Sequence, residues 1–284
     1  MHPAAPSDPI DFLVIGHVSL DRTPNGPRLG GTAAYAALTA RALGLRPAIV
    51  TSAGRGADLS GLLDIPMVTV PSPASTAFEN LYLDEGRVQL LLGRASGLTV
   101  EAIPEAWASA GIVHLGPIAD EMEPGLIEHI TSAQVLGVSA QGWLRAWDAD
   151  GRVRPRSWEW LAGPLQKADA VVVSYEDLGR DEIAIEGLTN HCRLLVVTDG
   201  PRGARVHWNG DVRRVPAPQA ASVDPTGAGD IFAAAFFARL RATRDPWEAA
   251  RFAQVLASAS VGRRGLDGIP TPADVSQAEL QVVP

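Results

Sequence analysis

The sequence is poor in cysteine and contains no apolar run of membrane-spanning length. Its single cysteine, Cys192, excludes an intrachain disulfide and a multi-cysteine metal cage. The apolar run 194–197 that follows favours a buried structural thiol over a nucleophile. No run approaches the roughly 20 residues of a membrane-spanning helix, and residues 1–9 lack the pattern of a signal peptide. We therefore expect a cytoplasmic protein with no membrane partner.

Lysine is also nearly absent, and positive charge is in deficit. Lys167 is the one lysine among 24 basic residues, and the net charge is −8 with a pI near 5.2. A Walker-type phosphate loop is excluded, because its obligatory lysine follows a glycine and Lys167 follows Gln166. No basic patch is evident that would neutralise nucleic-acid phosphates. We expect a small-molecule ligand, held by arginine, by metal or by backbone N–H groups.

Short apolar strand-like runs alternate with helix-like stretches along most of the chain. This alternation is typical of βαβ units that build a parallel sheet covered on both faces, so the predicted fold class is α/β, a three-layer sandwich. A length of 284 residues with 46% hydrophobic residues predicts one domain over 1–284. The predicted strands are Phe12–Ile15, Ala48–Thr51, Ile112–Leu115, Val135–Val138, Ala170–Val173 and Leu194–Thr198, and the predicted helices are Thr32–Leu43, Leu126–Thr131, Asp181–Leu188, Asp230–Leu240 and Pro246–Arg263.

Two strand-like runs, Ala77–Leu83 and Arg87–Leu92, break this alternation. Only residues 84–86 separate them, which indicates a β-hairpin. Both runs carry apolar residues at odd and even positions, so both faces need a cover. We interpret the hairpin as a small β-lid over a ligand cleft, over a partner subunit in a homodimer, or over both. The alternative is an antiparallel extension of the main sheet. The ends, 1–9 and 276–284, are typical of loose termini.

The stretch 222–230 carries most of the chemical information. Its two glycines, Gly227 and Gly229, open onto an apolar helix whose first N–H groups lack intrahelical partners, and such a helix end binds anions. Asp230 lies at this positive end, where the helix dipole is expected to keep it ionised and able to accept a proton. This combination suits phosphoryl transfer. The alternatives are an ordinary helix start that Asp230 caps and a dinucleotide fingerprint, which lacks its third glycine because Phe232 stands there.

The string DPTGAGD at 224–230 resembles the D-T-x-G-A-G-D signature of the PfkB, or ribokinase-like, carbohydrate kinase family, with Pro225 in place of threonine. Three further segments support the resemblance. LGGTAAYAA at 29–37 is similar to the double-glycine motif, IGHVSLD at 15–21 to the first strand with its substrate-binding aspartate, and VTDGPRGA at 197–204 to the nucleotide-binding turn. The matches follow the order of the family over residues 10–270. They imply a ribokinase-like fold with lid elements around 17–30 and 76–95.

The resemblance implies a role for each matching residue. Asp230 is the catalytic base, and the N–H groups of Gly227, Ala228 and Gly229 form the anion hole. Substrate hydroxyls would bind at Asp21 and Ser19, beyond the first strand, near the double glycine of the motif. The alternative for Asp21 is a cap of the following turn. The implied substrate-binding residues of the double-glycine motif are Gly30, Gly31 and Tyr35, and those bordering ATP are Thr198, Gly200, Gly203 and Gly265.

Three positions qualify the resemblance. Tyr35 stands where sugar kinases of the family have an asparagine, and a phenol is bulkier and offers one hydroxyl, which disfavours ribose or fructose. The family's N-x-x-E motif appears as SYED at 174–177, so Asp177 is the candidate that organises Mg²⁺ through water, without the amide that Ser174 replaces. Arg145 follows a predicted strand and is a candidate for binding a phosphate or a substrate carboxylate. The alternative is a surface arginine beside a core Trp143.

These features predict an ATP- and Mg²⁺-dependent kinase that phosphorylates a hydroxyl of a sugar, a cyclitol such as inositol, or a nucleoside. The alternative is a protein that keeps the fold but only senses a nucleotide or polyol. An oxidoreductase with a nucleotide cofactor is disfavoured by the missing third glycine.

Overall fold

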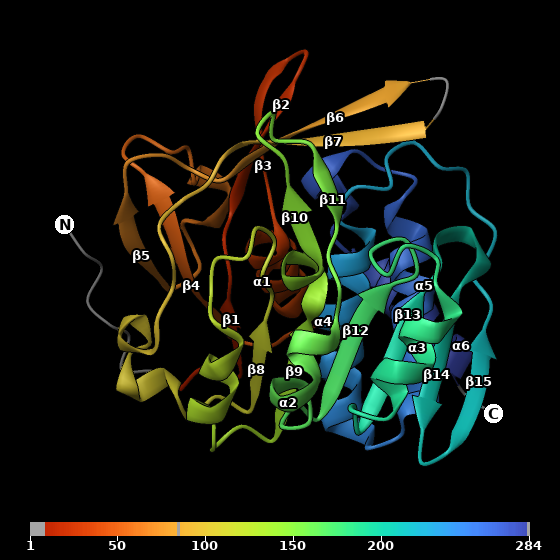
Figure 1. The fold of residues 1–284 in the computed structure, drawn as a ribbon. Helices are drawn as coiled ribbons and strands as arrows, with labels where there is room; N and C mark the ends of the chain where they lie inside the picture. Colours follow the sequence, from red (N-terminus) through yellow and green to blue (C-terminus); the bar gives the residue numbers. More distant parts are fainter. Residues whose placement is uncertain (1–8, 84–85, 283–284) are drawn as a thin grey trace.

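The computed structural model describes residues 9–83 and 86–282, and its centre is one nine-stranded sheet (Figure 1). The strand order is β15-β14-β13-β12-β9-β8-β1-β4-β5, and a second sheet, β3-β2-β6-β7, stands above one edge. The strands are β1 (Phe12–Ile15), β2 (Ser19–Thr23), β3 (Gly26–Gly30), β4 (Pro47–Gly54), β5 (Met67–Ser72), β6 (Ala77–Leu83), β7 (Gly86–Gly93), β8 (Ile112–Leu115), β9 (Val135–Ser139), β10 (Arg145–Trp147), β11 (Val153–Pro155), β12 (Ala170–Ser174), β13 (Leu194–Thr198), β14 (Ala204–Trp208) and β15 (Asp211–Val215).

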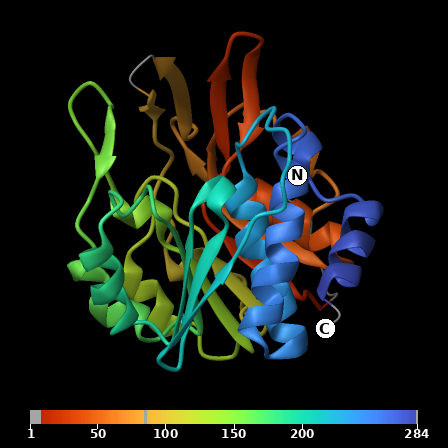
Figure 2. The ribbon, with the colours of Figure 1, turned by 90° about the vertical axis from the view of Figure 1, so that its right-hand side faces the viewer.

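The helices cover both faces of the large sheet, which confirms the predicted three-layer α/β sandwich (Figure 2). They are α1 (Thr32–Ala42), α2 (Ala162–Leu165), α3 (Glu182–Thr189), α4 (Ala228–Thr243), α5 (Pro246–Ser260) and α6 (Pro272–Val282). Helices α1, α4 and α5 pack on one face, and α3 packs on β13 from the other. Short 3₁₀ helices lie at Ser60–Leu62, Val100–Ala102, Glu105–Trp107, Pro124–His129, Ala140–Leu144, Glu159–Leu161, Gly200–Arg202 and Gly265–Gly268.

Strand β1 shows why this sequence forms a covered parallel sheet. All four of its residues are apolar and fully buried. Phe12 and Val14 belong to the core on one face, whereas Leu13 and Ile15 belong to the core on the other. Both neighbours of β1 are parallel to it, since Phe12 aligns with Pro47 on one side and with Ile112 on the other. A strand buried on both faces needs the continuous apolar run that the sequence provides.

The hairpin β6–β7 belongs to the small sheet, hereafter the lid sheet, so the alternative of an extension of the main sheet is wrong. The lid sheet also contains β2 and β3, and its strands lie within 17–30 and 76–95. Residues 84 and 85 of the predicted turn lie outside the described residues. One cover of the hairpin is a small apolar cluster in which Phe78 packs with Ile118 and Ala119. Leu81 and Leu92 remain 37% and 40% exposed, so the described hairpin is not buried on both faces.

Three local expectations need correction. The predicted helix at 126–131 is a 3₁₀ helix, Pro124–His129, whose tighter turns follow Pro124 at its start. The supposedly loose end contains helix α6, which packs on α5 and buries Ala278 completely. The antiparallel strands β14 and β15, which extend the sheet beyond β13, were not predicted. Within the described residues, no helix has both the length and the apolar character needed to cross a bilayer.

The contact between β9 and α4 gives a test of this packing. An added Cβ at Gly137 would lie 2.6 Å from ring carbons of Phe237, which is fully buried and has no free space to move. We expect Gly137→Ala to lower the free energy of unfolding by about 1–3 kcal/mol, measured by urea denaturation. Gly163→Ala is the control, because a Cβ there meets no atom within 4 Å. Equal midpoints for the two variants would contradict this packing.

Candidate active site

The predicted site residues gather at the edge where the parallel strands end. Strands β1, β8, β9, β12 and β13 run in the same direction, so their carboxyl ends share one edge of the large sheet. Ligands of open parallel sheets bind at this edge. Ser19 follows β1, Arg145 follows β9, Asp177 follows β12, and Thr198 ends β13. The lid sheet stands above the same edge (Figure 1).

The double glycine joins the lid sheet to helix α1. Gly30 ends β3 opposite Ser19 of β2, and an added Cβ there would lie 3.1 Å from the Ser19 hydroxyl and 3.4 Å from the Asp21 carboxylate. Gly31 has φ 83° and caps α1, and a Cβ there would approach the carbonyl oxygen of His17 to 2.7 Å. Gly31 therefore needs glycine, because its backbone turns in the left-handed region and passes close to other groups, whereas a side chain at Gly30 would crowd Ser19 and Asp21.

Asp21 lies inside strand β2 of the lid sheet, so the alternative that it caps the following turn is wrong. Its Oδ1 accepts a hydrogen bond of 3.3 Å from the amide of Phe78 on β6. Burial raises the pKa of Asp21, while hydrogen bonds from the Ser19 hydroxyl and the Phe78 amide and the charges of Arg28 and Arg145 lower it. Asp21 is thus a half-buried acceptor within the lid sheet.

The loop before α4 has the geometry expected of an anion site. Gly227 has φ 81° and caps the helix, and a Cβ there would lie 2.2 Å from the ring of Tyr35. Within the described residues, the amides of Gly227 and Gly229 have no hydrogen-bond acceptor. The amide of Ala228 donates to the carbonyl of Pro225 at 3.3 Å, so it is already engaged. The loop presents two of the three predicted amides for binding an anion.

Tyr35 lies beneath this loop rather than beside an open substrate cleft. Its side chain is 1% exposed, and its hydroxyl is buried without a partner among the described residues. Burial raises the pKa of the phenol, and the negative charge of Asp230 raises it further. The bulk that replaces the family's asparagine therefore fills space under Gly227, which glycine alone leaves open.

Asp230 is the third residue of α4 and meets α1 across the site. Thr32 Oγ1 donates to Asp230 Oδ1 at 2.5 Å. The pKa of Asp230 is raised to about 6. Burial is the largest cause, and the charges of Asp177 and Asp21 also raise the pKa, whereas the hydrogen bond from Thr32 and the charge of Arg145 lower it. Burial thus opposes the ionisation that the position of Asp230 at a helix start was expected to favour. A pKa near 6 leaves the carboxylate ionised at neutral pH and well matched to proton transfer.

Arg145 and Asp177 form a buried ion pair. Arg145 Nη2 lies 3.2 Å from Asp177 Oδ1, both side chains are 9% exposed, and the Ser174 hydroxyl donates to Asp177 Oδ2 at 2.6 Å. Arg145 is therefore no surface arginine, although Trp143 is a core residue as the alternative supposed. Within the described residues, no group of three His, Cys, Asp or Glu side chains could hold a metal ion. The residues around Asp177 do not fit a direct Mg²⁺ site, because the guanidinium already neutralises the carboxylate.

The residues predicted to border the nucleotide lie near the other end of the edge. Thr198 aligns with Ser174 of β12, and Gly200 and Gly203 flank the turn between β13 and β14. Gly203 has φ 91°, and a Cβ there would meet the carbonyl oxygen of Val215 at 2.0 Å, so this turn alone accounts for that glycine. Cys192 is a partly buried thiol whose pKa burial raises to about 12, as expected of a structural cysteine.

Asp224, to which the sequence analysis assigned no role, links the lid sheet, Gly265 and the loop before α4. Asp224 Oδ2 accepts from Arg28 of β3 at 3.0 Å and from the Gly265 amide at 3.1 Å, and Asp224 Oδ1 accepts from the Thr226 amide. Burial raises the pKa of Asp224, but these donors outweigh it and the pKa is lowered. Asp224 opens the predicted signature, so its place in that motif was the available signal.

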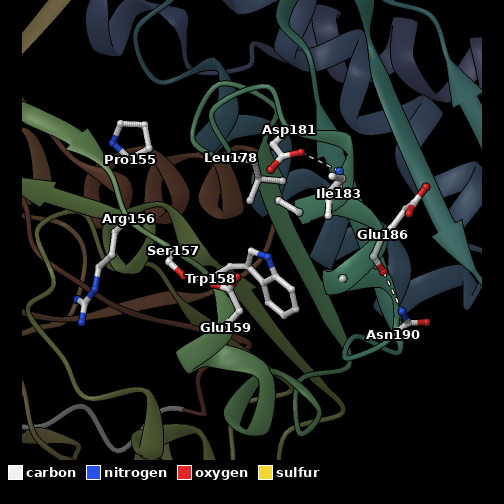
Figure 3. Close-up of a pocket in the computed structure, with 12 residues that line it drawn as sticks. Pro155, Arg156, Ser157, Trp158, Glu159, Leu178, Asp181, Ile183, Glu186 and Asn190 are labelled. Atoms are coloured by element: carbon white, nitrogen blue, oxygen red, sulfur yellow. Dashed lines mark hydrogen bonds between the residues drawn. The ribbon is translucent and has the colours of Figure 1, made fainter.

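Cavities in the described structure do not all coincide with this site. A cavity of about 110 Å³ is lined by Arg145 and Asp177, together with Gln89 of the lid sheet. A cavity of about 540 Å³ lies elsewhere, between the 155–159 segment and helix α3, with Trp158 facing α3 (Figure 3). None of the predicted site residues lines the larger cavity. Its volume therefore does not identify it as the active site.

Comparison with known proteins finds similarity to carbohydrate and nucleoside kinases. A model of the pfkB family carbohydrate kinase matches residues 178–273. A cytidine kinase of Thermococcus kodakarensis is 28% identical over 250 residues, which cover 81% of this chain and 88% of that one. An inositol 3-kinase of Oryza sativa subsp. japonica is 28% identical over 284 residues, which cover 91% of this chain and 70% of that one.

A solved structure shares the fold over nearly the whole chain. A pyrophosphate-dependent kinase in the ribokinase family superposes with a TM-score of 0.77 at 22% identity, covering 94% of this chain and 99% of that chain. The matched segment 178–273 contains the loop of Gly227 and Asp230. The chain is thus similar to pfkB family carbohydrate kinases in the segment that contains this loop, and over most of its length it shares the ribokinase-like fold and a likeness to alcohol-phosphorylating kinases.

Proposed function

We propose that the chain, as one domain over 1–284, transfers the terminal phosphoryl group of ATP to a hydroxyl of a sugar, a cyclitol or a nucleoside. One observation carries the proposal. Asp230 lies in the first turn of α4 with a pKa near 6, beside the amides of Gly227 and Gly229, which lack acceptors within the described residues. A proton acceptor and an anion hole at one helix start are the two elements that phosphoryl transfer needs.

Asp230 acts as the general base in this proposal. Its carboxylate takes the proton of the acceptor hydroxyl while the oxygen of that hydroxyl attacks the phosphoryl group. The amides of Gly227 and Gly229 donate to the oxygens of the transferred group, on which charge is concentrated. The amide of Ala228 joins them only after it leaves the carbonyl of Pro225, to which it donates at 3.3 Å.

The acceptor lies between the lid sheet and this helix start. Asp21, with its raised pKa, accepts a hydrogen bond from one substrate hydroxyl, and Ser19 beside it offers a second polar contact. Gly30 leaves the space next to both side chains open, and Arg145 contributes positive charge. Relatives that act as cytidine kinase, inositol 3-kinase and fructokinase support these three acceptor classes. Tyr35 acts through the shape of the loop, because its hydroxyl is buried.

The phosphoryl donor binds toward Thr198, Gly200, Gly203 and Gly265. The amide of Gly265 donates to Asp224, at the start of the loop 224–229 before α4, hereafter the anion loop. Family kinases use ATP with Mg²⁺, and Mg²⁺ neutralises phosphate charge when it is bound. The ion pair of Asp177 with Arg145 leaves no direct protein ligand for this ion among the residues predicted to hold it. Because solved structures of this fold include pyrophosphate-dependent kinases, pyrophosphate is the alternative donor to compare with ATP.

Replacement of the base gives the first functional test. Asp230→Asn keeps the shape of the side chain but cannot accept the proton, so we expect at least a hundredfold loss of kcat with nucleotide binding retained. The measurement is ADP release with fructose, myo-inositol and cytidine as acceptors, repeated as phosphate release with pyrophosphate as donor. Asp150→Asn, on an exposed turn, is the matched control and should keep wild-type turnover.

Two results would count against the kinase proposal. Wild-type turnover in Asp230→Asn would remove this carboxyl from the mechanism. If ligands stabilise the wild-type protein against heat but no acceptor in the panel yields ADP or phosphate, the chain acts as a sensor of nucleotide or polyol.

The raised pKa of Asp230 gives a second test. Only the ionised carboxylate accepts a proton, so activity requires a pH above its pKa, which is about 6 in the free protein. We expect kcat/KM to be constant above about pH 7 and to fall tenfold per unit below pH 6. Initial rates in buffers from pH 4.5 to 8.5 provide the measurement. A midpoint near 4, the value of an exposed aspartate, would show that burial does not control this group.

A further inference from the structure

Thr32, the first residue of α1, makes a close contact with the proposed base. Its side chain is 1% exposed, and its hydroxyl donates to Asp230 Oδ1 at 2.5 Å. Among the described residues, this is the only hydrogen bond that the Asp230 carboxyl receives. A hydroxyl has one proton to donate, so it can satisfy one carboxylate oxygen and leaves Oδ2 for another partner.

The side chain of Thr32 packs closely against the end of β8. A Cβ added to Gly116, which follows β8, would lie 2.3 Å from the Thr32 methyl carbon. A Cβ added to Gly16, which follows β1, would lie 2.3 Å from the carbonyl oxygen of Gly116. The absence of a side chain at Gly116 thus leaves the space that the Thr32 methyl occupies, and Gly16 lets the end of β1 approach the backbone of Gly116. This packing holds the methyl group on one side and directs the hydroxyl toward Asp230.

We propose that Thr32 is a positioning residue of the phosphoryl transfer: it holds Oδ1 of Asp230, so that Oδ2 faces the acceptor hydroxyl. The inference rests on the proposed function, because it requires Asp230 to be the base. It also assigns a role to the residue directly after the double glycine, a position that carries no implied role in the sequence motif.

The surroundings of Asp230 make the contribution of Thr32 measurable. The charged groups that act on this carboxyl are Arg145 of β10, Asp177 after β12 and Asp21 of β2, and Tyr35 of α1 lies nearby. Arg145 favours the ionised carboxylate and the two aspartates oppose it. Without the hydrogen bond of Thr32, the balance shifts toward the protonated form, because that bond lowers the pKa.

Thr32→Val tests the role with little change of volume, since valine keeps the methyl group and loses the hydroxyl. We expect kcat to fall by about tenfold to a hundredfold, the worth of a hydrogen bond to a charged group, with KM for the acceptor changed less than kcat. The midpoint of the pH profile of kcat/KM should move to higher pH. Thr32→Ser, which keeps the hydroxyl, should restore most of both. The acceptor is whichever of fructose, myo-inositol and cytidine gives the highest turnover.

Thr39→Val is the matched control. Thr39 lies in the same helix, is fully buried, and has a hydroxyl without a partner among the described residues. The same chemical change there should leave kcat and the pH midpoint as in the wild type, because no bond to the base is lost.

The packing supplies a second, independent variant. Gly116→Ala places a methyl group against the Thr32 methyl and should displace the hydroxyl, so kcat should fall as in Thr32→Val. In Gly116→Ala combined with Thr32→Ser, the clashing methyl of residue 32 is absent, and we expect kcat to recover at least threefold over Gly116→Ala alone.

The outcomes separate this inference from the proposed function. If Asp230→Asn is inactive while Thr32→Val keeps the wild-type kcat and pH midpoint, Asp230 remains the base and the role of Thr32 is overturned. If Asp230→Asn is fully active, the proposed function itself fails. A fall of kcat in Thr32→Val that Thr32→Ser does not restore, or that leaves the pH midpoint unchanged, also overturns the role of Thr32.

Discussion

The site depends on one constraint: the carboxyl of Asp230 must ionise although it is partly buried. Burial opposes ionisation and raises its pKa to about 6, and the neighbouring charges of Asp177 and Asp21 act in the same direction. The hydroxyl of Thr32 and the guanidinium of Arg145 act against them. These groups come from α1, the lid sheet, β10 and the end of β12, so the pKa of this one side chain depends on how the edge of the sheet is assembled.

Close backbone approach makes this assembly possible, and particular glycines permit it. Gly227 turns in the left-handed region and leaves room for the ring of Tyr35, while Gly31 turns α1 toward the ends of the strands. Gly116 leaves room for the Thr32 methyl. Side chains at these three positions would separate α1 from α4 or from the sheet. The positions of the anion loop and of Asp230 therefore depend on the absence of side chains at these glycines as much as on side-chain contacts.

The sequence predicts the parts of this site better than their pairing. The alternation of strand-like and helix-like runs predicts six of the nine strands of the large sheet and misses β5, β14 and β15. The resemblance of 224–230 to a family signature indicates the loop and Asp230 as the candidate site. The contact of Thr32 with Asp230 joins residues 198 positions apart, and that of Arg28 with Asp224 joins residues 196 apart. Such pairs follow only from the three-dimensional arrangement. The ion pair of Arg145 with Asp177 was missed for the same reason, and each residue was therefore given a separate ligand. Helix α6 was missed because its sequence is less apolar than those of α1, α3, α4 and α5, although Ala278 is fully buried.

Asp224 resembles Asp230 in that burial, hydrogen bonds and nearby charges together set its pKa. Three donors, from Arg28, Gly265 and Thr226, hold its carboxylate ionised despite burial. Arg28 belongs to the lid sheet, Gly265 lies on the side predicted for the nucleotide, and Thr226 belongs to the anion loop. Loss of any one donor leaves a partly buried carboxylate less well satisfied and raises its pKa. The lid, the loop and the nucleotide side are thus coupled through one shared acceptor, and a lid that moves away from the sheet also removes a positive charge from the start of the anion loop.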